Sequence, residues 1–130
     1  MAGITLIGCG AVGTQVAQRL ATRRDHFSRL VGEPLDLVHI VVRDTSRPRD
    51  DAIDPARFTT DMDTAIADPN VSIVCELMGG IDTARRAVEA AIAGGKHVVT
   101  ANKALLAEHG AELFAAARKA GVCIAFEGAV

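Results

Sequence analysis

The sequence contains no tryptophan or tyrosine and only three cysteines. Cys9, Cys75 and Cys123 are odd in number and far apart, and they form neither a CxxC pair nor a Cys/His group with the spacing of a zinc site. We therefore expect free thiols rather than disulfides or metal ligands. Because each cysteine lies in an apolar run, we expect all three to be buried. Free thiols are typical of a reducing cytoplasm.

The sequence also lacks an excess of basic charge and a long apolar segment. It has 14 Lys and Arg residues and 16 Asp and Glu residues, so the net charge is −2. Proteins that hold nucleic acid by bulk charge need a strongly basic surface. No stretch approaches the roughly 20 apolar residues of a membrane-spanning helix, and the first residues lack the basic flank of a signal peptide. We expect a cytoplasmic protein that binds neither nucleic acid nor membranes.

What the sequence does contain is a regular alternation of strand-like and helix-like segments. Its length of 130 residues and its apolar content of 49% fit one globular domain over residues 1–130. The apolar strand-like runs are residues 4–7, 37–42, 71–76, 97–100 and 122–126, with a weaker one at 57–60. Strands that alternate with helices favour a parallel sheet. The pattern predicts an α/β fold of the doubly wound Rossmann type, with a mainly parallel sheet and helices on both faces.

Helical spacing places the helices between these runs. Helices are predicted after Gly10, over residues 62–67, from Asp82 to the Gly94-Gly95 pair, and from residue 103 to Gly121. Asp82 is expected to cap the third of these helices. Residues 24–34 are polar and are predicted to be a loop that extends the first crossover.

The first strand runs into a glycine-rich turn, G-C-G-A-V-G, that matches G-x-G-x-x-G. Gly8 would permit the tight turn, Gly10 would let a pyrophosphate approach the backbone, and Gly13 would let the helix pack closely. Amides at the start of the helix, from Ala11 and Val12 onward, would then meet the phosphates. The alternative is an ordinary glycine turn, but the strand-turn-helix context favours a dinucleotide site.

The end of the second strand bears on the choice of cofactor. NAD sites usually place an acidic side chain there, whereas an arginine suits the 2′-phosphate of NADP. Arg43 comes first after the strand, followed by Asp44, and Arg47 and Arg49 lie in the same loop. We expect Arg43 to bind the phosphate and NADP to be the cofactor, with NAD as the alternative through Asp44. A solvated basic loop would look the same in sequence.

Three further blocks resemble the homoserine dehydrogenase family. They are E-L-M-G-G at residues 76–80, G-K-H-V-V-T-A-N-K-A-L-L-A at 95–107 and F-E-G-A-V at 126–130. Their order and their spacing from the glycine turn are similar to the amino-terminal cofactor domain of that family. The resemblance implies NAD(P)-dependent interconversion of L-homoserine and L-aspartate 4-semialdehyde, on the aspartate route to threonine, isoleucine and methionine.

The resemblance also implies roles for residues at two later strand ends. Met78, Gly79 and Gly80 would lie against the nicotinamide half of the cofactor, at the sheet edge where ligands bind. Asn102 would also contact the cofactor, and Lys103 would face both the nicotinamide and the substrate. Without the resemblance, these residues would be interpreted as a flexible turn and a surface lysine at a helix start.

The family resemblance implies a monovalent-cation site as well. Glu127 and the Val130 carbonyl match its first two ligands, which suit Na⁺. The other ligands would follow Val130, so we expect the site to be empty. The family's catalytic and dimerisation region, with its acid/base lysine, is expected to be absent too. We therefore expect the chain to bind cofactor but to be inactive alone, and the parent enzyme to act on a small-molecule substrate as a homo-oligomer.

Two other functions remain open at this point. A stand-alone nucleotide- or redox-sensing regulatory domain would share the glycine turn, but such domains usually carry an acidic residue after the second strand. The cofactor domain of another dehydrogenase, such as a dihydrodipicolinate reductase or an aspartate dehydrogenase, would differ in the later motifs. Arg43 and Lys103 favour the enzyme over the regulatory domain, and the later motifs favour homoserine dehydrogenase over the other dehydrogenases.

Overall fold

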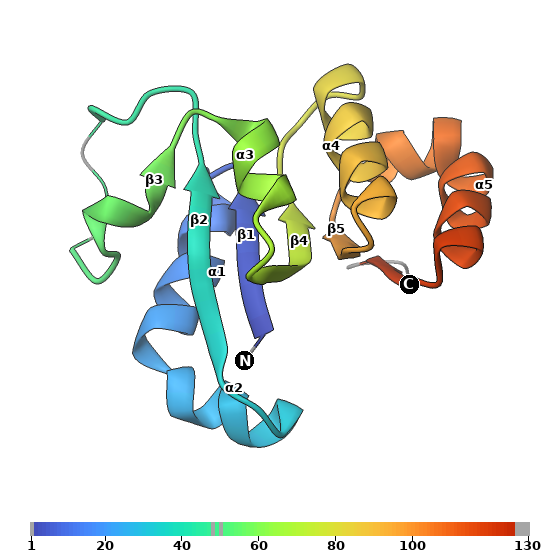
Figure 1. The fold of residues 1–130 in the computed structure, drawn as a ribbon. Helices are drawn as coiled ribbons and strands as arrows, with labels where there is room; N and C mark the ends of the chain where they lie inside the picture. Colours follow the sequence, from blue (N-terminus) through green and yellow to red (C-terminus); the bar gives the residue numbers. More distant parts are fainter. Residues whose placement is uncertain (1, 48, 50, 127–130) are drawn as a thin grey trace.

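A six-stranded parallel sheet with helices on both faces organises the chain (Figure 1). The computed structural model describes residues 2–47, 49 and 51–126. The strand order is β3-β2-β1-β4-β5-β6, and every neighbouring pair is parallel. The strands are β1 (Ala2–Ile7), β2 (Leu35–Val41), β3 (Phe58–Thr59), β4 (Val71–Glu76), β5 (His97–Thr100) and β6 (Ile124–Phe126). This order, which reverses direction at β1, is that of a doubly wound nucleotide-binding fold, and the predicted fold class is confirmed.

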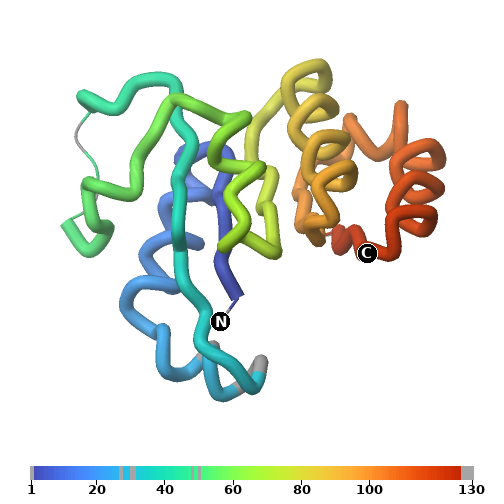
Figure 2. Tube along the Cα trace, in the orientation of Figure 1, coloured from blue at the N-terminus to red at the C-terminus, as the bar shows by residue number. Residues whose placement is uncertain are grey.

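The helices lie in two layers that bury opposite faces of the sheet (Figures 1 and 2). They are α1 (Ala11–Thr22), α2 (Arg24–Val31), α3 (Met62–Ala67), α4 (Asp82–Ala93) and α5 (Lys103–Ala120), with a short 3₁₀ turn η1 (Pro55–Arg57). Leu6 and Ile7 are neighbours in β1 and both fully buried, yet Leu6 packs with Ala17 of α1 and Ile7 packs with the α3–α4–α5 core. Because successive side chains alternate between faces, a strand covered on both sides is largely apolar.

Two local predictions about helices are wrong. Residues 24–31, expected as loop, form helix α2, which ends at Gly32 in the left-handed conformation with φ +87°. The polar composition of α2 gives no clear apolar face in the sequence. An acidic residue in its first turn (Asp25) and the glycine that ends it could have indicated the helix. Asp82 does not cap α4: Ile81 occupies the N-cap position, and Asp82 is the first helical residue. Its carboxylate there is still favourable to the helix dipole.

The three cysteines differ in burial. Cys9 is buried and Cys75 is largely so, and burial raises the pKa of the Cys75 thiol to about 11. Cys123 is exposed, which contradicts the prediction that all three are buried. It lies in the short connection between α5 and β6, at the outer edge of the sheet.

Over residues 2–47, 49 and 51–126 the structure shows no group of three His, Cys, Asp or Glu that could share a metal ion, and no helix suited to crossing a membrane.

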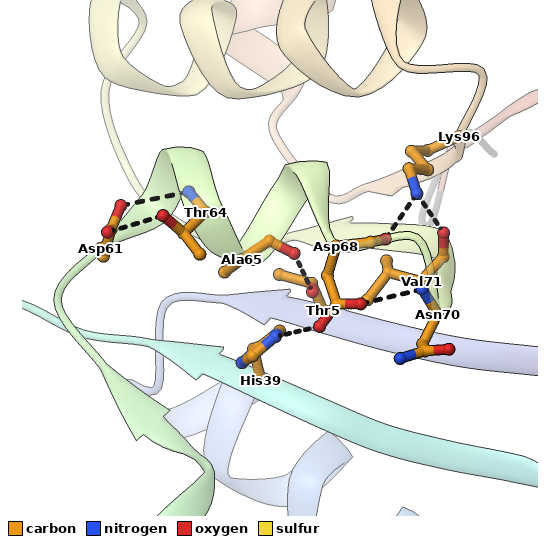
Figure 3. A network of polar contacts seen from close by, with 9 residues as sticks. All are labelled: Thr5, His39, Asp61, Thr64, Ala65, Asp68, Asn70, Val71 and Lys96. Atoms are coloured by element: carbon orange, nitrogen blue, oxygen red, sulfur yellow. Dashed lines mark hydrogen bonds and ion pairs between the residues drawn. The ribbon is translucent and has the colours of Figure 1, made fainter.

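Polar contacts join α3 and the turn after it to β1, to β2 and to Lys96 before β5 (Figure 3). Lys96, only 8% exposed, donates from Nζ to the carbonyl oxygens of Asp68, at 2.7 Å, and Val71. The carboxylate of Asp68 pairs with His39 Nε2 of β2 at 2.8 Å, and the Thr5 hydroxyl of β1 donates to the Ala65 carbonyl at 2.7 Å. Val71 begins β4, and Lys96 immediately precedes β5. Ligands of open parallel sheets bind at the opposite, carboxyl ends, so we assign this network to stability.

Candidate functional site

A groove of about 660 Å³ opens at the carboxyl ends of the strands, where β1 separates the two halves of the sheet. Its walls are the glycine turn after β1, the loops after β2 and β4, and the starts of α3 and α4. The predicted site residues among its lining are Gly8, Gly10, Arg43, Met78 and Gly79. Such a switch point is where doubly wound folds bind nucleotides.

The three glycines of the turn are required for different reasons. Gly8 has φ +96°, a conformation that other residues rarely adopt, and its amide donates to the Val41 carbonyl at 2.9 Å. A Cβ on Gly13 would lie 2.4 Å from the Gly8 carbonyl oxygen, so any side chain there would push α1 off the turn. A Cβ on Gly10 would meet no protein atom within 4 Å. The absence of a side chain at Gly10 therefore leaves space toward the groove rather than serving internal packing.

The start of α1 is open to an incoming anion. Gly10 occupies the N-cap position, no side chain caps the helix, and no acidic residue lies in its first turn. Ala11 and Val12 are exposed, and Val12 at 58% is unusually exposed for a large apolar residue. The first amides of a helix have no partner within the helix and carry its positive dipole end. These residues fit the predicted role of binding phosphate.

The loop after β2 places positive charge on the lip of the groove. Arg43 is exposed, and both Arg43 and Arg47 line the groove. Asp44 lies beside them, but its Oδ1 accepts from the Ser46 amide at 2.9 Å and the Ser46 hydroxyl at 2.6 Å. These bonds hold the pKa of Asp44 below its usual value, so the carboxylate stays ionised and occupied. Asp44, the acidic residue that could bind NAD, therefore already uses one carboxylate oxygen for hydrogen bonds within its own turn.

Arg49 has a structural role that the sequence did not reveal. Its guanidinium donates to the Cys9 carbonyl at 3.2 Å and to the Asp44 carbonyl at 3.1 Å, and it lies 5.4 Å from the centre of the Phe58 ring. It therefore ties the glycine turn to the loop after β2 across 40 residues of sequence. No local pattern distinguishes Arg49 from Arg43, because its partners are carbonyl groups that only the folded chain brings near.

A buried carboxyl group lies at the end of β4. Glu76 is 0% exposed, and its Oε1 accepts from the Thr100 hydroxyl of β5 at 2.7 Å while Oε2 accepts from the Met78 amide at 2.8 Å. Burial raises the pKa of Glu76, although hydrogen bonds from Thr100, Met78 and the Asn102 side chain oppose that rise. Glu76 belongs to the E-L-M-G-G block, but no role for it was predicted from the sequence. An acidic residue ending an apolar strand was the available signal.

Asn102 and Lys103 begin α5 beside this carboxyl. The Asn102 side chain caps the helix by accepting from the Leu105 amide at 3.0 Å and donates to the Gly80 carbonyl at 2.6 Å. Lys103 is exposed. Gly80, Asn102 and Lys103 do not line the groove itself, but the hydrogen bond between Asn102 and Gly80 joins their two loops at neighbouring strand ends. The predicted cation ligands, Glu127 and Val130, lie outside the described residues.

Replacing Glu76 by Gln is expected to alter the pH dependence of stability. Because burial raises the pKa of Glu76 above its ordinary 4.5, the folded chain holds this proton more tightly than the unfolded chain. Its contribution to the free energy of unfolding is largest below about pH 4.5 and declines as pH rises through the folded pKa. Hydrogen bonds lower the pKa values of Asp44, Asp61 and Asp68 below the ordinary 3.8. These groups therefore change the free energy of unfolding mainly below pH 3.8, outside the pH range in which Glu76 titrates.

Urea unfolding between about pH 4 and about pH 8 measures this effect. Wild type should lose stability relative to Glu76→Gln as pH rises across that range. Glu112, 67% exposed at its side chain, provides the control, because Glu112→Gln should follow the wild-type profile. Parallel profiles for wild type and Glu76→Gln would contradict the expectation.

Comparison with known proteins identifies the family to which the chain belongs. A family model described as "Homoserine dehydrogenase, NAD binding domain" matches residues 8–127, nearly the whole chain. The chain belongs to the homoserine dehydrogenase NAD-binding domain family. The family resemblance stated from the sequence motifs is thereby confirmed, and the chain is a nicotinamide-dinucleotide-binding domain of that family.

Relatives and solved structures agree with this membership. The homoserine dehydrogenase of Corynebacterium glutamicum is 44% identical over 128 residues, and that of Synechocystis is 38% identical over 127. A homoserine dehydrogenase structure from Thiobacillus denitrificans superposes with a TM-score of 0.89 at 39% identity, covering 99% of this chain and 30% of that one. One from S. aureus gives 0.91 at 34% identity, covering 99% and 32%.

This homoserine dehydrogenase domain spans less than a third of the relatives it matches. The alignments cover 98% of the chain but only 28% of the Corynebacterium glutamicum enzyme and 29% of the Synechocystis enzyme. The shared portion is the dinucleotide-binding part. The activity of a whole enzyme therefore does not follow from the match alone.

Proposed function

We propose that this domain holds NADP in the groove beside Gly8 and Gly10, as the cofactor half of an NAD(P)-dependent homoserine dehydrogenase. The observation that carries the proposal is the open Gly10 position at the start of an uncapped helix, with Arg43 on the lip of the same groove. The helix start and Gly10 suit the pyrophosphate, and Arg43 suits a 2′-phosphate. NAD has no 2′-phosphate, so it would make the pyrophosphate contacts but not the contact with Arg43.

In the proposed enzyme, the nicotinamide supplies hydride exchange with C4 of homoserine and aspartate 4-semialdehyde. The contribution of this domain is to bind and orient the cofactor. Met78, Gly79 and Gly80 form the wall on the nicotinamide side, aided by Asn102, and Lys103 at the start of α5 carries a positive charge toward the reacting end. Glu127 and Val130 would contribute the first oxygen ligands of a Na⁺ site.

The family resemblance places the acid/base lysine and the substrate pocket in the catalytic region of the enzyme rather than in the cofactor domain. Hydride transfer requires a substrate held against the nicotinamide. We therefore propose that the 130 residues bind cofactor but do not turn over homoserine alone. The parent would be a cytoplasmic homo-oligomer whose remaining part binds the small-molecule substrate.

Calorimetric titration with NADPH and NADH tests this function. NADPH should bind at least about tenfold more tightly than NADH, because a guanidinium–phosphate contact is worth more than about 1.4 kcal/mol. Equal affinities would remove the NADP assignment, and failure of both to bind would remove the cofactor role. An assay with homoserine and NADP should show no turnover by the isolated chain, and turnover at an enzymatic rate would contradict the inactivity proposed here.

A further inference from the structure

The carboxyl of Glu76 belongs to a closed ring of hydrogen bonds that joins the two loops on the nicotinamide side of the groove. One arm runs from Glu76 to the Met78 amide, in the loop after β4. The other runs to the Thr100 hydroxyl, which accepts from the Asn102 amide at 3.1 Å in the loop after β5. The Asn102 side chain then reaches back to the Gly80 carbonyl at 2.6 Å and closes the ring.

Sheet stability alone does not account for a carboxyl group at this position. Removing a carboxyl from water is unfavourable, and an apolar residue of similar size is often at least as stabilising. The next inward residue of β4 on the same face, Val74, is apolar and fully buried. The hydrogen-bond partners of Glu76 lie at the carboxyl edge of the sheet: Thr100 is the last residue of β5, and Met78 lies in the loop after β4. The carboxyl therefore fixes those loops relative to one another.

We propose that Glu76 is a positioning residue for the nicotinamide half of the cofactor. It holds the Met78–Gly80 backbone and the Asn102–Lys103 helix start in one arrangement. The two loops that would contact the nicotinamide are therefore positioned before the cofactor binds. Glu76 touches neither cofactor nor substrate. This inference rests on the proposed function, since it assigns the wall to the nicotinamide.

The test compares the whole cofactor with an analogue that lacks only the nicotinamide ring. Glu76→Gln replaces one carboxyl oxygen by an NH₂ group. Facing Met78, that group would oppose another N–H donor; facing Thr100, it would make the hydroxyl accept, so that the hydroxyl loses the acceptor of its own O–H. NADPH affinity, measured by calorimetry, should fall about tenfold, the loss expected for one such mismatch. Affinity for 2′-phospho-ADP-ribose, which lacks the nicotinamide, should stay within about twofold because its proposed contacts lie at Gly10 and Arg43.

Matched variants separate positioning from general support of the sheet. Thr100→Val should reproduce the selective loss, and Thr100→Ser, which keeps the hydroxyl, should restore wild-type behaviour. Thr5→Val removes another buried hydroxyl bond of the sheet, remote from the groove, and should lower stability without changing the ratio of the two affinities. If Glu76→Gln fails to fold, Thr100→Val carries the comparison.

The outcomes distinguish this inference from the proposed function. Equal losses for NADPH and 2′-phospho-ADP-ribose in Glu76→Gln and Thr100→Val would overturn the positioning role and leave the cofactor role intact. Wild type binding both ligands equally would also overturn it, since the nicotinamide wall would then contribute nothing. Wild type binding neither ligand would refute the proposed function itself, and the inference with it.

Discussion

Gly10→Ala is expected to leave the fold unchanged and to weaken binding of both NADPH and NADH by at least about tenfold. The backbone at Gly10, with φ −78° and ψ −153°, is open to any residue, and an added Cβ meets no protein atom within 4 Å. The methyl group would instead occupy the space that the pyrophosphate needs to reach the first amides of α1. Calorimetry measures the affinity, and urea unfolding checks that stability is retained.

Gly13→Ala is the informative contrast from the same motif. Its Cβ would lie 2.4 Å from the Gly8 carbonyl oxygen, which is backbone and has little freedom to move. We expect a loss of stability of about 1 to 3 kcal/mol, typical of overpacking, in addition to weaker binding. If Gly10→Ala binds both cofactors as wild type does, the pyrophosphate does not rest on this turn.

Arg43→Ala is expected to weaken NADPH binding by roughly 1.5 to 3 kcal/mol and to leave NADH almost unaffected. Arg43 is exposed on the lip of the groove, while the neighbouring Arg49 is held by the Cys9 and Asp44 carbonyls. A guanidinium free to move can form paired hydrogen bonds with a 2′-phosphate, and only NADP carries that group.

Arg47→Ala provides a matched control for Arg43→Ala, because it removes the same charge from the same loop. A general field effect would weaken NADPH similarly in both variants and would be reduced by salt. A direct contact predicts a clearly larger loss for Arg43→Ala. Equal losses of NADPH and NADH in Arg43→Ala would show that Arg43 does not read the 2′-phosphate.

The central strands of the sheet could be predicted from the sequence because helices cover both of their faces, so that their residues are mostly apolar. Leu6 and Ile7 illustrate this, because they are neighbours in β1 but pack into the cores on opposite faces of the sheet. Helix α2 could not be predicted by the same criterion, because it is polar and its prediction depends on end signals such as Gly32. The exposure of Cys123 was missed because its apolar neighbours did not reveal that it lies at the sheet edge.

The site divides in a similar way. The glycine turn could be predicted because close approach of backbone to backbone or to a ligand requires glycine at fixed spacings. The roles of Arg49 and Glu76 could not, because each has a partner that only the fold brings near: the Cys9 carbonyl, 40 residues from Arg49, and the Thr100 hydroxyl of β5. A guanidinium that holds carbonyl groups and one that awaits a phosphate look alike in sequence, and only their folded surroundings separate them.

The most direct measurement is a crystal structure of this chain with NADPH bound. The account predicts diphosphate oxygens within hydrogen-bonding distance of the main-chain nitrogens of Ala11 and Val12, with the phosphorylated ribose beside Arg43 and the reduced ring toward Gly79. Density for the dinucleotide away from the α1 terminus, or a diphosphate that bypasses Gly10, would contradict it.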